Sequence, residues 1–431
     1  MKSRSHCLYA VAMTLAALSG CIGKTDTSQP DDALFCDNIA DHVQSVEQLH
    51  VASDTTAVNT IVSNKHIEHD PTYAMWFSVM DYADILRDKS AEEFRTIMGE
   101  RFDNAANMGI NTVYLHVRAY QDAYYCSTLF PMGSYANADL DFDPLEIMIE
   151  EAHIRNLSVH AWINPLRGPG TKAMEAMEEK YQVKQWYSNA DTNGTYLVLV
   201  NSYWWLNPAY PEVRQFTAEG VAEIVEHYDI DGIHMDDFFY PTTDDTFDEA
   251  AFAASNETDR SVFRQIQCNE MVSLIYDTVK NYDSSLVVSI SPQGTMQDND
   301  NQYADVSTWS STEGYCDVLI PQIYYGFENE FAPFTDMVAL WNTIISCDKV
   351  DFVVGICTYK LGCEDTWAGS GCQEWIENLD IPERQVSFLM TLDNVDGIAI
   401  YDYDTTFQPE SATEAMAQEV IAITNLLRNK S

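Results

Sequence analysis

The chain has 431 residues, 46% of them hydrophobic, so it is too long for a small disulfide-stapled module and can bury a substantial core. Its 67 acidic residues outnumber its 23 basic residues, and the formal net charge at pH 7 is −44. Nucleic acids and anionic lipid faces both favour Lys and Arg, so this charge excludes both as partners and is compatible with a neutral or cationic substrate.

The N-terminus has the pattern of an export signal. A basic start precedes an apolar run over residues 8–18 that is too short to cross a bilayer as a permanent anchor. The run leads into Leu-Ser-Gly-Cys at residues 18–21, which resembles a bacterial lipobox with Cys21 as the lipidated residue. We therefore expect residues 1–21 to be a lipoprotein signal peptide and the protein to be extracytoplasmic, held to a bacterial membrane through its lipid only. An ordinary secretory signal with a chance cysteine is the alternative.

Residues 22–72 are polar and weakly periodic, which predicts a tether and an N-terminal segment. From residue 73 onward, apolar strands alternate with amphipathic helices. The expected strands are 73–78, 112–117, 158–163, 230–235, 286–290, 318–323, 352–356 and 395–401. Helices are expected after a capping box at residues 90–93, after Asp143-Pro144, and over 211–227, 261–281, 334–346, 373–379 and 409–428.

Strands separated by helices pair in parallel through right-handed crossovers. Eight such units over residues 73–431 predict an α/β fold, a (β/α)8 TIM barrel, with an inserted β-hairpin at 188–207 before strand four. An open doubly wound sheet is the alternative, although the sequence has no Gly-x-Gly-x-x-Gly turn that would support a dinucleotide fold.

Eight cysteines follow Cys21, an even number that permits disulfides in an exported chain. Cys357, Cys363 and Cys372 lie close in sequence and could staple one loop. None forms a Cys-x-x-Cys pair, so we expect no zinc knuckle. Buried free thiols are the alternative to disulfides.

Polar and aromatic residues gather at the predicted strand ends, where the active groups of a barrel enzyme lie. The candidates, from the second strand to the eighth, are Arg118, Asp122, His160, Trp162, Asn164, Arg167, His234, Asp236, Asp237, Tyr240, Gln322, Tyr324 and Asp402. The strand bodies between them are apolar. This distribution is typical of a pocket for a polar, flat-faced ligand.

Residues 231–241, Asp-Gly-Ile-His-Met-Asp-Asp-Phe-Phe-Tyr-Pro, closely resemble the signature of the glycosyl-hydrolase-like family ten, also called unknown-function domain 187. Further motifs match that family in order: Arg118 with Asp122, and the segments 161–167, 205–208, 291–294 and 321–324. The resemblance covers residues 73–407. It implies an extracytoplasmic (β/α)8 barrel related to enzymes that cut peptidoglycan glycan strands. His116 departs from the pattern, standing where the family has glutamine.

The fourth strand also faintly resembles the chitinase signature Asp-Gly-x-Asp-x-Asp-x-Glu. Asp231 and Asp236 align with it, but His234 replaces the middle acid and Phe238 replaces the catalytic glutamate. A chitinase-type mechanism carried by this strand alone is therefore not expected.

Glycoside cleavage needs one acid to protonate the leaving oxygen and a second carboxylate as nucleophile or base. Strand alternation places His234 and Asp236 on the barrel interior, with Asp237 starting the next loop. Because adjacent carboxylates repel, one of them keeps a raised pKa and can serve as the acid. We expect Asp236 to be the principal catalytic carboxylate and Asp237 the second, with Asp122 and Asp402 as the next candidates. Alternatively, Asp237 caps the loop or orients an arginine.

The remaining candidates are expected to contact substrate. Arginine forks and amides suit sugar hydroxyls and acetamides, which assigns Arg118, Asn164, Arg167, Gln322 and Tyr324 to substrate positioning. Asp122, His160, His234 and Asp402 complete the polar contacts, and Trp162, Trp205, Tyr240 and Tyr325 could stack on sugar faces. Alternatively, the polar groups hold the barrel loops together and the aromatic rings are core.

Together these features predict a glycoside hydrolase that acts on a polysaccharide, in particular peptidoglycan glycan strands, without a cofactor. Two other functions remain open. His116, His160 and His234 near three strand ends permit a metal-dependent polysaccharide deacetylase. A non-catalytic glycan-binding lipoprotein on the same scaffold is the third, although a pure binder has no need of two crowded carboxylates.

Overall fold

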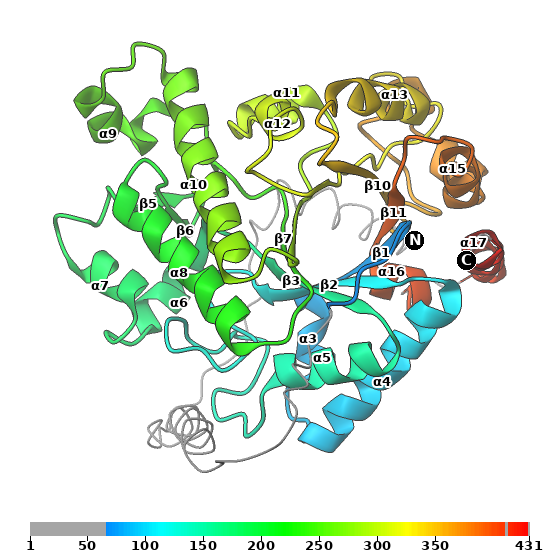
Figure 1. The fold of residues 1–431 in the computed structure, drawn as a ribbon, viewed down its shortest axis with the longest axis horizontal. Helices are drawn as coiled ribbons and strands as arrows, with labels where there is room; N and C mark the ends of the chain where they lie inside the picture. The colour runs from blue at the N-terminus through cyan, green and yellow to red at the C-terminus, as the bar shows by residue number, and fades with distance from the viewer. Residues whose placement is uncertain (1–65, 410–412, 430–431) are drawn as a thin grey trace, which may run out of the picture.

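The computed structural model describes residues 66–409 and 413–429. The predicted signal peptide, Cys21 and most of the predicted tether lie outside the described residues. Eight parallel strands close into a barrel in the order β1-β11-β10-β9-β8-β7-β3-β2, with helices around it (Figure 1). The barrel strands are β1 (Thr72–Phe77), β2 (Thr112–Arg118), β3 (Ser158–Ile163), β7 (Gly232–Met235), β8 (Val287–Ile290), β9 (Val318–Leu319), β10 (Asp351–Cys357) and β11 (Gly397–Tyr401).

The TIM barrel predicted from the sequence is therefore confirmed. Each expected strand forms, the strand at 158–163 with the predicted bounds and the others with at least one end differing by one to four residues. Strands β2 and β3 are buried along their whole length. A strand covered by helices outside and side chains inside has no solvent face, which explains why these segments read as apolar runs.

Local sequence signals fix the helices that cover the barrel. Ser90 and Glu93 form the expected capping box at the start of α4, and the Asp143 carboxylate caps α5 with Pro144 in its first turn. The long helices are α4 (Ala91–Met108), α5 (Pro144–Ile154), α8 (Pro211–His227), α10 (Arg260–Tyr282), α13 (Phe334–Ile344), α15 (Ile381–Leu389) and α17 (Glu414–Arg428).

Shorter helical segments stand mainly in the loops. They are η1 (Val79–Asp81), α3 (Tyr82–Ile85), α6 (Thr171–Ala176), α7 (Gln182–Ser188), η2 (Asp245–Phe247), α9 (Glu249–Ala254), α11 (Met296–Asn301), α12 (Val306–Trp309), η3 (Gly369–Gly371), α14 (Glu374–Glu377) and α16 (Tyr403–Phe407). The helix expected over 373–379 is only the single turn α14. The covering helix α15 follows it and begins at Ile381, with Pro382, a residue suited to a first helical turn, directly after.

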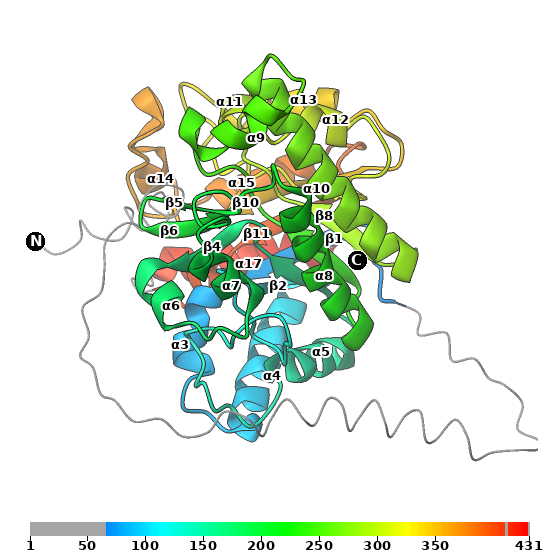
Figure 2. The same cartoon turned by 90° about the vertical axis from the view of Figure 1, so that its left-hand side faces the viewer.

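The expected hairpin before the fourth barrel strand also forms. Strands β5 (Leu197–Val200) and β6 (Tyr203–Leu206) pair antiparallel around Asn201 and Ser202, both with positive φ, as a two-residue hairpin turn requires. A third strand that the sequence did not predict, β4 (Arg167–Gly170), pairs with β6. Figure 2 shows this small sheet and α14 at the same end of the barrel.

Cys357, Cys363 and Cys372 form no disulfide with one another, so the loop staple does not form. All three are free thiols, of which Cys357 is buried and Cys363 and Cys372 are half-buried. Within the described ranges, no helix has the length and apolarity needed to cross a bilayer.

Candidate active site

The site is built around the end of β7, at the C-terminal mouth of the barrel. Register pairs Trp162 of β3 with His234 of β7 on the interior face. Asp236 follows on that same face, one residue beyond the strand, and Asp237 comes next. Both carboxylates thus lie at the strand end, as expected from the sequence, and this is where a barrel enzyme carries its chemistry.

Asp236 is nearly buried, with 4% of its surface exposed. Burial and the charge of Asp237 raise the pKa of Asp236 well above its usual value, although Arg167 and the Trp162 indole act in the opposite direction. The backbone N–H of Phe238 donates weakly to its Oδ1, at 3.4 Å. Asp236 therefore holds its proton more firmly than a solvent-exposed aspartic acid does.

Asp237 is 7% exposed, but hydrogen-bond donors surround it. Burial raises the pKa of Asp237 to about 6, while its backbone contact, Gln322 and Arg167 limit the rise. The side-chain amide of Gln293 also donates to Asp237 Oδ2. Of the two carboxyl groups, Asp237 therefore ionises first as the pH rises, and Asp236 keeps its proton to a higher pH.

Arg167 faces this pair from the first position of β4, the short strand that follows β3 in the chain. Its guanidinium carbon lies 4.3 Å from the ring centre of Phe238 and 4.7 and 5.4 Å from those of Tyr120 and Tyr203. The side chain is only 8% exposed, yet its buried Nε has no hydrogen-bond partner. Among the described residues it makes no ion pair within 4 Å. Three rings thus hold a cation beside the carboxylates with its Nε donor unused.

Two expected contacts, Arg118 and Asp122, instead support the loop after β2. Strand β2 has a register irregularity between His116 and Arg118, so Arg118 pairs with Ile163 and its side chain leaves the interior face. Its guanidinium lies over the Phe130 ring at 4.7 Å, against Gly220 of helix α8. The Asp122 carboxylate accepts the backbone N–H groups of Ala119 and Tyr120.

The histidines lie in the barrel interior beneath the carboxylates. His234 is bonded through both ring nitrogens, to Trp76 and Ser289. His116 stacks on Trp162 with ring centres 3.7 Å apart, and burial and Arg167 hold its pKa well below the usual value. Burial lowers the pKa of His160 to about 4. Over the part of the chain that the structure describes, no three His, Cys, Asp or Glu side chains are grouped so that they could hold a metal ion.

The mouth next to Asp237 is formed by the strands β8, β9 and β11. Gln322 donates to the Ser291 carbonyl at 3.2 Å and lies beside Asp237. The ring centres of Tyr324 and Tyr401 lie 5.8 Å apart. The charges of Asp236 and Asp237 both raise the pKa of Tyr401, so this ring is close to the pair. Gln322 and Tyr324 are thus brought to the carboxylates, and their role in positioning substrate stays a prediction.

Three other candidates have structural partners. The Asn164 amide donates to the Ala119 carbonyl at 3.3 Å and joins two loops, with its Oδ1 left without a partner. Tyr240 packs between Phe247 and Tyr303, inside the core. Asp402 caps α16 through Thr405, and burial raises the pKa of Asp402 to about 6.

Sequence reasoning did not single out Gln293 or Tyr203, and it placed Tyr120 and Tyr401 at strand ends without giving them a role in the site. Gln293 stood inside the family motif at 291–294, which could have identified it. Phe238 was noted only as a replacement for a glutamate, yet its ring holds Arg167. No sequence pattern marks an aromatic ring as the partner of a distant arginine.

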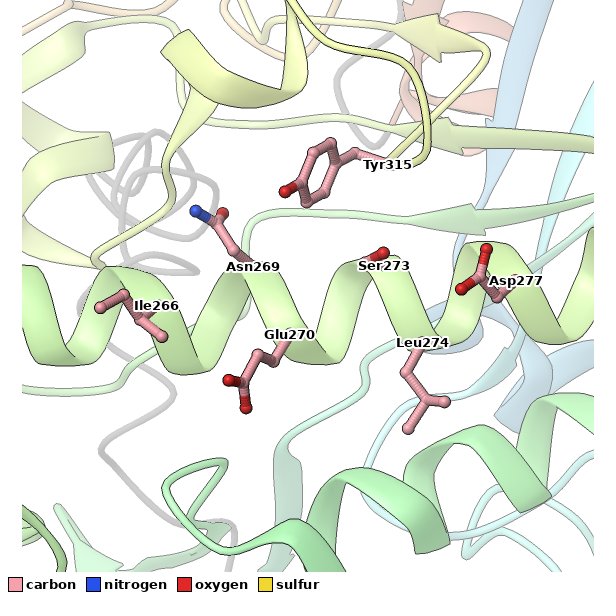
Figure 3. Close-up of a pocket in the computed structure, with 7 residues that line it drawn as sticks. All are labelled: Ile266, Asn269, Glu270, Ser273, Leu274, Asp277 and Tyr315. Carbon is pink, nitrogen blue, oxygen red and sulfur yellow. The ribbon is translucent and has the colours of Figure 1, made fainter. Parts of the chain in front are cut away.

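A surface cavity lies elsewhere, along the outer face of α10 (Figure 3). Its volume is about 530 Å³, and it is lined by Ile266, Asn269, Glu270, Ser273, Leu274, Asp277 and Tyr315. None of the predicted site residues lines it, so it is separate from the mouth of the barrel.

Comparison with known proteins gives a family match. The model of the family described as Glycosyl hydrolase-like 10 matches residues 72–368. Glycosyl hydrolase YngK of Bacillus subtilis is 28% identical over 317 residues, covering 67% of this chain and 60% of that protein. The chain thus spans less than two thirds of YngK. Glycosyl hydrolase DigH of Escherichia coli K12 is 24% identical over 351 residues, covering 73% and 76%.

A solved structure shares the fold. The glycoside hydrolase domain of PgaB from Bordetella bronchiseptica superposes with a TM-score of 0.52 at 14% identity, covering 84% of this chain and 99% of that one.

Proposed function

Because the chain belongs to the glycosyl hydrolase-like 10 family, we propose that it hydrolyses glycosidic bonds within a polysaccharide, with Asp236 and Asp237 as the reacting carboxylates. One observation carries the proposal: two adjacent, buried carboxylates at the barrel mouth whose environments separate their pKa values. Such a separation is the usual basis for dividing acid and base roles between two carboxyl groups.

In this mechanism Asp236 is the general acid. Its pKa is raised well above the usual value of an aspartic acid, so it is the member of the pair that carries the proton to be delivered to the leaving glycosidic oxygen as the bond breaks. Asp237 is ionised above about pH 6 and serves the other half of the reaction, as nucleophile or as the base that activates water. Gln293 and Gln322 hold the Asp237 carboxylate in place.

Arg167 positions the substrate beside this pair. Its guanidinium donors suit a carboxylate or several sugar oxygens, and the rings of Tyr120, Tyr203 and Phe238 fix its orientation in advance. Its charge also favours the ionised form of Asp237 and so lowers the pKa of that residue.

The substrate we propose is the glycan strand of peptidoglycan, in a form stripped of stem peptides. The family resemblance supports it, and a stripped strand offers Arg167 a free carboxylate on its muramic acid units. The export signal over residues 1–21 supports an extracytoplasmic location, with the lipid on Cys21 as the membrane anchor.

The test uses glycan strands prepared from purified peptidoglycan by amidase digestion, with released reducing ends and fragment masses as readouts. Wild-type protein should release reducing ends, also in the presence of a chelator, and Asp236→Asn should lose this activity. Loss of acetyl groups with no new reducing ends, abolished by chelator, would identify a deacetylase. Binding without any release would identify a glycan-binding protein, and an active Asp236→Asn variant would overturn the assignment of the acid.

A further inference from the structure

Two loops on the mouth side of the barrel expose large aromatic side chains. Phe331, in the loop between β9 and α13, is 74% exposed, and Trp367, in the loop between β10 and α14, is 63% exposed. Over the described ranges one other large aromatic residue is similarly exposed, Tyr282 at the end of α10. Isolated exposed rings need no explanation, but neighbouring ones are typical of a binding surface.

Phe331 and Trp367 are neighbours because their loops are joined. The backbone N–H of Glu330 donates to the Ala368 carbonyl at 3.0 Å. The backbone N–H of Ser370 returns a bond to the Glu330 carboxylate at 2.8 Å. A Cβ built on Gly369 would lie 2.9 Å from the Phe331 ring. We call Phe331 and Trp367 the rim platform.

Buried hydrogen bonds hold the backbone of the rim platform. The buried Glu374 carboxylate accepts the N–H groups of Phe327 and Glu328, at 3.0 and 2.9 Å. Asn329 Oδ1 accepts the N–H groups of Phe331 and Ala332, at 3.0 and 2.9 Å. The loops are thus ordered before any ligand binds, which lowers the entropic cost of using the rings for recognition.

Contacts connect the rim platform to the catalytic pair. Gln293, which donates to Asp237, precedes Gly294, and a Cβ on Gly294 would lie 2.7 Å from the Tyr325 ring. The ammonium of Lys360 lies 5.8 Å from the centre of that ring and forms a buried ion pair of 2.7 Å with Asp365, two residues before Trp367. The platform therefore stands outward from the Asp237 side of the site.

A second group of aromatic residues lies across the mouth. In the barrel order β3 and β10 are four strands apart, which places them on opposite sides of the ring. The β5–β6 hairpin follows β3 in the chain. The ring centre of its Trp205 lies 6.3 Å from that of Phe238, the ring that holds Arg167. Figure 2 shows the hairpin and α14 on the mouth side. A chain that crosses the site between these two walls would leave it over the rim platform.

We propose that the rim platform stacks on an outer, uncharged sugar unit of the polysaccharide that is cleaved at Asp236 and Asp237. The inference rests on the hydrolase function proposed above. The exposed charges of the two loops are those of Glu328, Glu330 and Glu364, while Lys360, the only basic residue of these loops, is buried and paired. An exposed cation outside them, Arg384 of α15, lies over the Phe327 ring at 4.5 Å and pairs with Asp380. The acidic charge of the two loops disfavours an anionic membrane or nucleic acid, whereas sugar rings offer an apolar face to aromatic groups and hydroxyl donors to carboxylates.

The test compares Phe331→Ala/Trp367→Ala with Tyr282→Ala, a matched exposed aromatic residue that is not in these loops. Both changes are made in full-length Asp236→Asn protein, so that bound chains stay intact. Exposed positions tolerate such changes without unfolding. Dissociation constants are measured by calorimetry for peptidoglycan glycan strands separated by length. Long strands should bind about tenfold more weakly to the double variant, as expected for losing two stacking contacts, and equally well to Tyr282→Ala.

A second measurement records contact directly. Hydroxyl-radical footprinting with long strands should protect Trp367 and leave Tyr282 reactive. If the double variant binds long strands with unchanged affinity and Trp367 stays unprotected, the rim platform is overturned. Cleavage of the strands by wild-type protein would still uphold the hydrolase function. If Trp367 is protected by strands that wild-type protein does not cleave, the rim platform is upheld and the hydrolase function is overturned. A wild-type protein that neither binds nor cleaves the strands overturns both proposals. A dimer in sedimentation that the double variant abolishes would identify a second copy as the occupant and also overturn the proposal.

Discussion

The indole N–H of Trp76 on β1 donates a hydrogen bond of 2.9 Å to Nε2 of His234 on β7. These strands are not neighbours in the barrel, so the bond crosses its interior. Because Nε2 accepts, the proton of the imidazole is on Nδ1, which donates to Ser289 Oγ at 2.8 Å. Burial, with His160 and His116 nearby, holds the pKa of His234 well below its usual value. A neutral, fully bonded ring therefore fixes β7 beneath Asp236.

Trp76→Phe should lower the free energy of unfolding by about 1–3 kcal/mol, because it leaves His234 Nε2 buried without a donor. Urea denaturation measures the loss. The double variant Trp76→Phe/His234→Phe removes the unpaired nitrogen as well, so its loss should be smaller than the sum of the two single losses. Additive losses would show that the bond across the barrel contributes nothing of its own.

The fall in activity on the acid side of the pH profile, the acid limb, should follow the protonation of Asp237. Since burial raises the pKa of Asp237 to about 6, kcat/KM on glycan strands should fall as the pH drops below that value and the base becomes protonated. The alkaline side should report the loss of the Asp236 proton, at a pH well above the usual range of an aspartic acid. Initial rates of reducing-end release from about pH 4 to about pH 9 give both limbs.

Asp298 provides a way to shift the acid limb without touching the catalytic pair. Its charge raises the pKa of Asp237, so Asp298→Asn should move the acid limb to lower pH. Asp300→Asn, on the same short helix α11, is the matched control and should leave the limb in place. Equal shifts in both variants would mean that the limb follows net charge alone.

Arg167→Gln should shift the same limb in the other direction. Arg167 lowers the pKa of Asp236 and of Asp237, so removing its charge raises both values and moves the acid limb to higher pH. KM should also rise, because the substrate loses the guanidinium donors of Arg167. Arg167→Lys keeps the charge but not the planar fork, so it should restore the limb and leave KM high. An acid limb that stays in place in Arg167→Gln would contradict the assignment.

Much of this architecture was accessible from sequence. The apolar strand runs, the Ser90 capping box and the Asp143-Pro144 start each depend on neighbouring residues, so local patterns identify them. The position of Asp236 follows from alternation along β7, an unbroken strand.

The features that the sequence did not reveal depend on contacts between distant segments. Alternation would point Arg118 inward, but the irregularity of β2 turns it toward Gly220, and a sequence does not show where such an irregularity falls. The cage around Arg167 draws its rings from three separate segments, so only the folded chain reveals it.

The packing of Arg118 against α8 gives a prediction about stability. A Cβ on Gly220 would overlap Arg118 Nη1 and lie 2.8 Å from the Phe130 ring, and both neighbours are buried. Gly220→Ala should therefore destabilise the protein by about 1–3 kcal/mol, the usual cost of overpacking. Alanine is the better helix former by roughly 0.5–1 kcal/mol, so the steric cost must exceed that gain.

Gly99→Ala is the matched control, since Gly99 also lies within a long helix, α4. There a Cβ would meet only the ends of two flexible side chains, Arg155 Nη2 at 3.0 Å and Glu151 Oε2 at 3.1 Å, which can move aside. This variant should keep wild-type stability or gain slightly from the improved helix propensity. Denaturant unfolding of both variants tests the contrast. If Gly220→Ala is as stable as Gly99→Ala, the Arg118 side chain does not occupy the space between β2 and α8, and it would be free to face the mouth of the barrel as its sequence position predicted.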